Sequence, residues 1–122
     1  MRGQPPQFSL PKGFPGFGPT GPALVTLDEF DGTSPLRLRC WLNDELVHDG
    51  HTGQMILRVD VLIDRISAVC TLYPGDLIFT GTPAGVGMGR VPARYLTDGD
   101  MVRTEIEGIG EMEHVFIGPT AP

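Results

Sequence analysis

A loop rich in glycine and threonine, directly after a short apolar run, has the clearest chemical potential in this sequence. It lies within Tyr73–Arg90, which reads YPGDLIFTGTPAGVGMGR. Glycine has no Cβ, so this loop can adopt positive φ angles and bring its own backbone close to a ligand. Thr80 and Thr82 add hydroxyl groups at the end of the apolar run Leu77–Phe79, which we expect to form a strand. Hydroxyl and backbone N–H donors placed together favour the binding of a small anionic ligand.

Lys12 is the only lysine in the chain, and it stands between Phe8 and Phe14 in a segment of glycine and proline. An ammonium group among apolar and aromatic side chains can lose part of its hydration and pair with the anion of a ligand. An ordinary surface lysine is an equally good interpretation of the same residues. Lys12 therefore needs support from a partner elsewhere in the fold.

The glycines Gly85, Gly87 and Gly89 do not form a nucleotide-binding motif. A Rossmann fingerprint requires Gly-x-Gly-x-x-Gly at the start of a helix. Here the third glycine comes one residue early, and Pro92 follows where the helix would grow. No lysine follows the glycines, which excludes a Walker A loop. A loop that is merely tight is the plain alternative to a loop that binds a ligand.

The three histidines, His48, His51 and His114, make a weak case for a metal site. His48 and His51 have His-x-x-His spacing near the end of an expected hairpin, but no third ligand lies within reach in the sequence. We expect surface positions for them, and we predict no metal ligands in this chain. The acidic residues of the segment 105–113 alternate with apolar ones. That pattern favours the solvent side of a hairpin over a catalytic pair of carboxylates.

Further strands are predicted by short apolar runs and by alternation of apolar and polar residues. They are expected at 23–27, 36–42, 45–49, 101–107 and 111–117. Asn43-Asp44 would turn the first hairpin, because both residues tolerate left-handed conformations, and Gly108–Gly110 would turn the second. Helical spacing of apolar residues predicts one helix from about Val59 to Leu72, which Pro74-Gly75 would end.

Composition narrows the class of protein. The chain has 122 residues, of which 17 are glycine and 12 are proline, and 40% are hydrophobic, so we expect one loop-rich, mainly β (α+β) domain. The net charge of −6 argues against a nucleic-acid surface. We find no apolar run long enough for a membrane span and no signal peptide, and we expect a cytoplasmic protein. Cys40 and Cys70 are expected as reduced, buried thiols, one in a strand and one in the helix.

Taken together, these segments resemble the C-terminal part of the fumarylacetoacetate hydrolase family. The resemblance runs from about Gln7 to Gly118 and is most specific in LYPGDLIFTGTPAGVG at 72–87. Other matching pieces lie at 7–22, 41–50, 52–56, 98–100 and 106–110. The resemblance implies a mixed β-roll of the family's C-terminal domain type, with one main helix and long Gly/Pro loops. It divides the chain into a Pro/Gly-rich loop that carries the lysine, a catalytic-domain portion and a tail. These are residues 1–22, 23–118 and 119–122.

The resemblance also implies a chemistry on 2-keto acids. Family members hydrolyse a C–C bond of acylpyruvates, decarboxylate oxaloacetate or shift a keto–enol equilibrium, and Mg²⁺ or Mn²⁺ chelates the keto acid and stabilises the enolate. Lys12 matches the family's active-site lysine, and Thr82 matches the threonine that binds the substrate carboxylate, with the Gly81 backbone beside it. We therefore predict Lys12 as catalytic, and Lys12, Gly81 and Thr82 as substrate-binding walls of one pocket. Gln7 matches a polar position to which no role is given.

The sequence departs from the family on the metal side. The resemblance places the metal ligands, a Glu-x-Glu pair and an Asp, upstream of the lysine, and the eleven residues before Lys12 contain no such pattern. Pro15 also replaces the Asp that usually follows this lysine. We therefore expect the chain alone to bind no metal and to be an inactive portion of an enzyme, or alternatively a non-catalytic binding or assembly module. Exposed sheet edges favour a homodimer, or a partner that supplies the N-terminal half.

Overall fold

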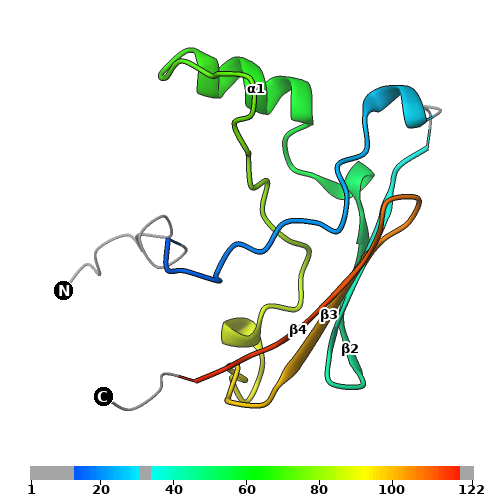
Figure 1. The fold of residues 1–122 in the computed structure, drawn as a ribbon, viewed down its shortest axis with the longest axis vertical. Helices are drawn as coiled ribbons and strands as arrows, with labels where there is room; N and C mark the ends of the chain where they lie inside the picture. Colours follow the sequence, from blue (N-terminus) through cyan, green and yellow to red (C-terminus); the bar gives the residue numbers. More distant parts are fainter. Residues whose placement is uncertain (1–12, 31–33, 119–122) are drawn as a thin grey trace.

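The computed structural model describes residues 13–30 and 34–118. Its centre is a four-stranded sheet in the order β2-β1-β3-β4, in which every pair of neighbours is antiparallel (Figure 1). The strands are β1 (Arg37–Leu42), β2 (Glu45–His51), β3 (Met101–Ile106) and β4 (Gly110–Val115). One α-helix, α1 (Val59–Ser67), and three short 3₁₀ helices, η1 (Leu27–Glu29), η2 (Thr52–Gln54) and η3 (Gly87–Gly89), complete the regular structure of the described residues. The predicted mainly β fold with one main helix and long loops is confirmed.

The first hairpin has the predicted turn. Asn43 adopts a φ of 55°, which is the left-handed conformation that asparagine tolerates better than most residues. A β-bulge follows, because the pairing shifts between Cys40 and Trp41. Trp41 faces Leu46 and Cys40 faces His48, so Val47 is the extra residue of β2. The bulge brings His48 onto the same face of the sheet as Cys40.

The helix is shorter than the predicted span to Leu72. It ends at Ser67, where the N–H groups of Val69 and Cys70 both reach back to the Ile66 carbonyl. These bonds close the last turn, so the helix ends several residues before Pro74, which was expected to end it. Cys70 therefore lies beyond the helix and is exposed, so its predicted burial in a helix is wrong. Cys40 is half-buried in β1, and both cysteines are free thiols as expected.

Two predicted strands, at 23–27 and 77–79, are wrong. Residues 23–26 form an irregular stretch that leads into the 3₁₀ helix η1, and residues 77–79 carry no ladder in the described part of the chain. Leu77 and Phe79 expose 65% and 73% of their surface. A run of apolar residues becomes a strand only where a neighbouring strand accepts its backbone hydrogen bonds. Among the described residues these two runs have none.

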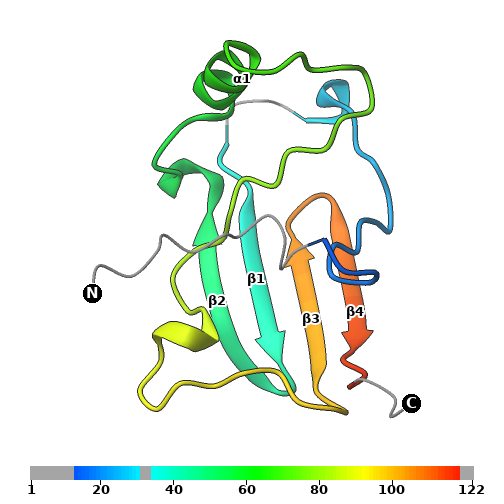
Figure 2. The ribbon, with the colours of Figure 1, turned by 90° about the vertical axis from the view of Figure 1, so that its left-hand side faces the viewer.

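The two faces of the sheet differ in what covers them. The long segments 13–30 and 70–96 both run along one side of the sheet, as the two views show (Figures 1 and 2). A Cβ added at Gly21 would lie 4.0 Å from the Met112 sulfur, and one at Gly18 would lie 3.5 Å from the Phe79 ring. We call this side the loop-covered face. No described segment covers the opposite side, which we call the open face.

Side chains in the described regions 13–30 and 34–118 are only partly shielded from water. None of the large apolar side chains there is buried, and Ile56 and Val91 are fully exposed. Asp100 is the one buried polar side chain there, with an exposure of 6%. Within these same ranges, no helix is long and apolar enough to cross a membrane.

Candidate functional site

The Gly/Thr loop lies against β2 on the loop-covered face. Gly81 has a φ of 93° and Gly85 a φ of 123°, so the positive φ angles predicted for this loop are present. Pro83 packs directly over Gly50 of β2, where an added Cβ would come within 2.9 Å of the proline ring. Because Gly50 has no side chain, the loop can approach the sheet closely. Thr82 is thereby carried to the edge of the sheet.

Thr82 forms a hydrogen bond with a histidine of the sheet. The distance between Thr82 Oγ1 and His48 Nδ1 is 3.0 Å. His48 is half-buried, and this burial lowers the pKa of its imidazole; nearby Arg90 acts in the same direction. A hydrogen bond with the Gly85 backbone works against both. A neutral ring is the form that burial favours.

Gly85 fixes the position of the loop relative to the bulge in β2. A Cβ at this position would collide with the carbonyl oxygen of Val47, the extra residue of the bulge. The backbone at Gly85 therefore packs directly on the backbone of β2, which only a residue without a side chain permits. Val47 and Gly85 thus set the distance between His48 and Thr82.

Two ionic contacts hold the chain that follows the loop. Arg90 forms a salt bridge of 2.8 Å with Glu45 at the start of β2, which lowers the pKa of the Glu45 carboxyl. Arg94 binds both carboxylate oxygens of Asp100 at 2.7 Å. Arg94 also donates its backbone N–H to the Gly87 carbonyl, which joins the glycine loop to the start of β3.

Asp100 accepts hydrogen bonds from two separate segments of the chain. Besides Arg94, it accepts bonds from the backbone and hydroxyl of Thr97 and from the side-chain amide of Asn43. The Arg94 guanidinium first, and these donors with it, hold the pKa of the Asp100 carboxyl well below its usual range. Asp100 therefore ties the loop to the turn of the first hairpin.

The predicted site residues are only partly within the described regions. Gly81 and Thr82 lie on the loop as expected, whereas Lys12 and Gln7 lie outside the described residues. The shared pocket between Lys12 and Thr82 therefore stays a prediction. His51 and His114 are exposed as predicted, but His48 is half-buried against the loop and its surface assignment is wrong.

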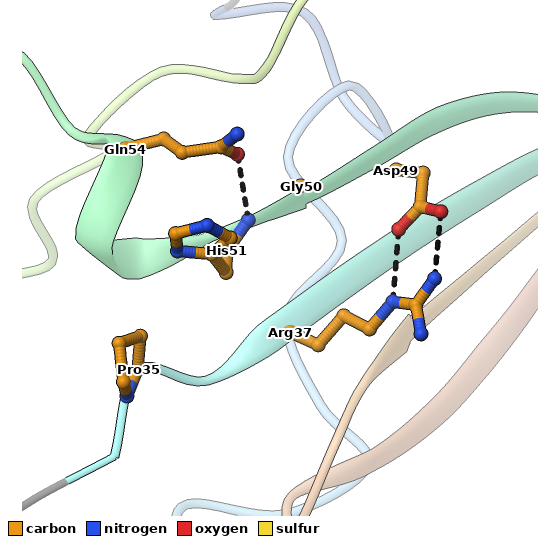
Figure 3. Close-up of a pocket in the computed structure, with 6 residues that line it drawn as sticks. All are labelled: Pro35, Arg37, Asp49, Gly50, His51 and Gln54. Atoms are coloured by element: carbon orange, nitrogen blue, oxygen red, sulfur yellow. Dashed lines mark hydrogen bonds and ion pairs between the residues drawn. The ribbon is translucent and has the colours of Figure 1, made fainter.

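Thr82 lines neither of two hollows found among the described residues. The first, of about 510 Å³, is an open depression at one end of β1 and β2 (Figure 3). Its polar groups are used internally, since Arg37 and Asp49 form a two-bond pair of 2.9 and 2.7 Å and Gln54 accepts the His51 N–H. The second, of about 740 Å³, lies between the loop at 15–19 and β4 and is mostly apolar.

A metal centre does not arise from the described side chains. In residues 13–30 and 34–118 no three His, Cys, Asp or Glu side chains come together in a way that could hold an ion. The donor set that Mg²⁺ or Mn²⁺ prefers, several oxygen ligands around one point, is thus not provided by this part of the chain. What the site offers is a hydroxyl, backbone N–H groups and a histidine.

Comparisons with known proteins decide the family. The profile described as "Fumarylacetoacetate (FAA) hydrolase C-terminal" matches residues 1–117. The chain belongs to the fumarylacetoacetate hydrolase family. Within the family it is similar to the mitochondrial oxaloacetate tautomerase Fahd2a of Rattus norvegicus, with 46% identity over 85% of this chain and 33% of the relative.

Solved structures of the fumarylacetoacetate hydrolase family share the fold. Fumarylacetoacetate hydrolase from psychrophilic Exiguobacterium antarcticum has a TM-score of 0.79 and 41% identity, over 85% of this chain and 37% of that one. Maleylpyruvate hydrolase from Sphingobium sp. SYK-6, solved with manganese(II) and pyruvate, has a TM-score of 0.70 and 37% identity, over 80% and 34%. The chain spans about a third of the length of the curated relatives it matches, since the matched part is 33% to 35% of each relative.

Proposed function

We propose that this chain provides the carboxylate-binding wall of a metal-dependent enzyme that acts on 2-keto acids. The observation that carries the proposal is the Thr82 hydroxyl, which is held by His48 at 3.0 Å on a loop of the family's most specific motif. A hydroxyl beside a backbone with positive φ is a suitable receptor for a carboxylate, because O–H and N–H donors converge there. Family membership supplies the substrate class.

Each residue has a proposed task. The Thr82 hydroxyl and the Gly81 backbone bind and orient the substrate carboxylate. Lys12 places its ammonium where negative charge develops on the substrate, a kind of stabilisation worth a few kcal/mol in a preorganised site. The metal is assigned to carboxylates other than those described, because the described residues gather no such cluster. When bound, it would act as a Lewis acid towards the keto acid.

Similarity to the relatives supports an order among the reactions that we propose. Keto–enol tautomerisation of oxaloacetate comes first, because identity is 46% to the rat tautomerase and 37% to the maleylpyruvate hydrolase. Hydrolysis of an acylpyruvate C–C bond and decarboxylation of oxaloacetate are the other reactions we propose for this substrate class. All three pass through an enolate, so the same carboxylate wall serves each of them.

Oxalate, a flat dianion that resembles an enolised keto acid, provides the direct test. Calorimetric titration of the 122-residue chain should show binding. Lys12→Ala should weaken it strongly, because it removes the proposed cation. Unchanged oxalate affinity in Lys12→Ala would contradict the role proposed for Lys12, and no binding at all would overturn the proposal. Assays with oxaloacetate and acetylpyruvate in the presence of Mg²⁺ then show whether the chain alone converts either substrate.

A second candidate is an assembly module without catalysis. The many exposed large apolar side chains favour it, Ile56 and Val91 among them, because extensive exposed apolar surface is typical of interaction sites. In either case we propose that the chain associates, as a homodimer or with a polypeptide that carries the metal-binding half of the family fold. Sedimentation velocity should show a species heavier than the 13.2 kDa monomer. A monomer at every concentration would contradict self-association.

A further inference from the structure

The hydrogen bond between Thr82 and His48 leaves open which atom donates the proton. A threonine hydroxyl has one proton to donate and two positions at which its oxygen accepts. A carboxylate can only accept. If the Thr82 proton points to a carboxylate ligand, the 3.0 Å contact with His48 Nδ1 needs a proton on that nitrogen.

The Gly85 backbone restricts the form of the His48 ring. The Gly85 backbone lies beside Cδ2 of the ring, the carbon next to Nε2, and it raises the pKa of His48 as a carbonyl acceptor does. Because Nδ1 faces Thr82, we assign the Gly85 bond to Nε2. A neutral His48 with its proton on Nε2 then has only a lone pair at Nδ1, and it accepts the Thr82 proton. In that state Thr82 has no proton left for a ligand.

We propose that His48 is a positioning residue that takes up a proton when a carboxylate binds at Thr82. In the imidazolium form Nε2–H still donates to Gly85 and Nδ1–H donates to Thr82 Oγ1. The Thr82 hydroxyl proton is then released to the ligand. The inference rests on the function proposed above, and it extends that function from substrate binding to the control of that binding by pH.

The groups around His48 agree with this direction. Arg90 lowers the pKa of the ring, but its charge is committed to Glu45 through a 2.8 Å salt bridge. Cys40 faces His48 across the strands, and burial raises the pKa of its thiol, so it stays neutral. Burial keeps the ligand-free ring neutral. A bound carboxylate adds negative charge beside it, which favours the imidazolium.

The sign of the pH effect follows from linkage. The pKa of His48 lies below the ordinary value of about 6.5 without ligand and rises when the carboxylate binds. Between these two values, binding takes up as much as one proton per ligand. Affinity therefore falls as pH rises through this window, with a slope that approaches about tenfold per pH unit. Above the pKa of the liganded form the affinity levels off.

Two measurements on the 122-residue chain test the inference, with oxalate as the probe. The first is the ¹⁵N chemical shift pattern of the His48 ring, which should show a neutral ring protonated at Nε2 without oxalate and an imidazolium with oxalate at the same pH. The second is calorimetric titration between pH 5.5 and 8 in two buffers of different ionisation enthalpy, which counts the protons taken up. Oxalate remains a dianion throughout this range.

His48→Gln separates positioning from simple packing. The glutamine amide can donate to Thr82 Oγ1 without titrating, so this variant should bind oxalate with little dependence on pH and no proton uptake. His114→Gln, which removes an exposed histidine of β4, is the matched control and should retain the wild-type proton uptake.

The outcomes distinguish this inference from the proposed function. Oxalate binding without proton uptake, or uptake that persists in His48→Gln, overturns the role of His48 and leaves the carboxylate site intact. A ligand-free ring already protonated at Nδ1 also overturns it, and needs no variant to fold. Failure of the wild type to bind oxalate at any pH overturns both proposals.

Discussion

The open face and the loop-covered face of the same sheet are built on different principles. The open face carries three salt bridges of 2.7 to 2.9 Å between described residues. Arg37 pairs with Asp49, Arg39 with Glu105 and Arg103 with Glu111. Trp41 lies among them, with the Arg103 and Arg39 guanidinium carbons 3.8 and 5.4 Å from the ring centroid. The acidic segment 105–113 thus faces solvent as predicted, and two of its carboxylates, Glu105 and Glu111, are paired with arginines.

The loop-covered face depends instead on close packing at glycine positions. Gly85 and Gly50 admit contacts that a single methyl group would prevent, and one hydrogen bond joins Thr82 to His48. Exposed ion pairs are individually weak and tolerate replacement. Close backbone contacts do not, because a clash moves a whole segment. The difference teaches that sensitivity to mutation should be concentrated on the face that carries the candidate site.

Gly85→Ala should have the largest effect on stability. Its Cβ would overlap the Val47 carbonyl at a φ of 123°, so the loop must detach from β2, with a loss of about 3 kcal/mol in the free energy of unfolding. Urea denaturation measures it. Gly75→Ala is the matched control, because Gly75 has a φ of 96° but open space around it and should lose only about 1 kcal/mol from backbone strain. Equal losses in both variants would contradict the backbone contact.

Asp100→Asn should destabilise the loop-covered side and change its response to acid. The depressed pKa of Asp100 means that its contribution is fully present above the unfolded value of about 3.9 and is lost as pH falls towards the lower folded value. We expect the melting temperature at pH 7 to fall by about 10 °C, with a smaller further loss below pH 4 than in the wild type. If the melting temperatures of the two proteins fall equally as pH is lowered below 4, Asp100 is not the titrating group.

Thr82→Val should reduce oxalate affinity about tenfold with little change in stability, because it removes one hydrogen bond to a charged ligand from an exposed position. Calorimetry at pH 6 gives the affinity. Thr71→Val, on an exposed stretch before the loop, is the control and should bind as the wild type does. Wild-type affinity in Thr82→Val would show that the carboxylate does not bind at Thr82.

The open face should give the smallest effect. A double-mutant cycle with Arg39→Ala and Glu105→Ala is expected to yield a coupling of about 0.5 kcal/mol, since the pair is only partly shielded from water. The coupling should shrink further at 1 M salt, where the screening length is about 3 Å. A coupling above about 2 kcal/mol would place these charges in a far less solvated setting than their exposure indicates.

Local signals in the sequence predicted most of the sheet. Asn43 marked the first turn, and alternation gave both hairpins, because each depends on residues close together in the chain. The strands expected at 23–27 and 77–79 failed because pairing partners are not encoded locally. The position of His48 was missed for a similar reason. The bulge at Val47 reverses the alternation of β2, so that Leu46 faces Trp41 whereas His48 faces Cys40 and the loop.

The position of Trp41 determines what the intrinsic fluorescence of the protein can report. It is the only tryptophan in the chain, and two guanidinium groups contact its ring on the side opposite to Thr82. Its fluorescence emission should therefore change when the strands unfold and remain unchanged when an anion binds at the Gly/Thr loop. A dye attached to the exposed Cys70 would be needed as a second reporter for the other side.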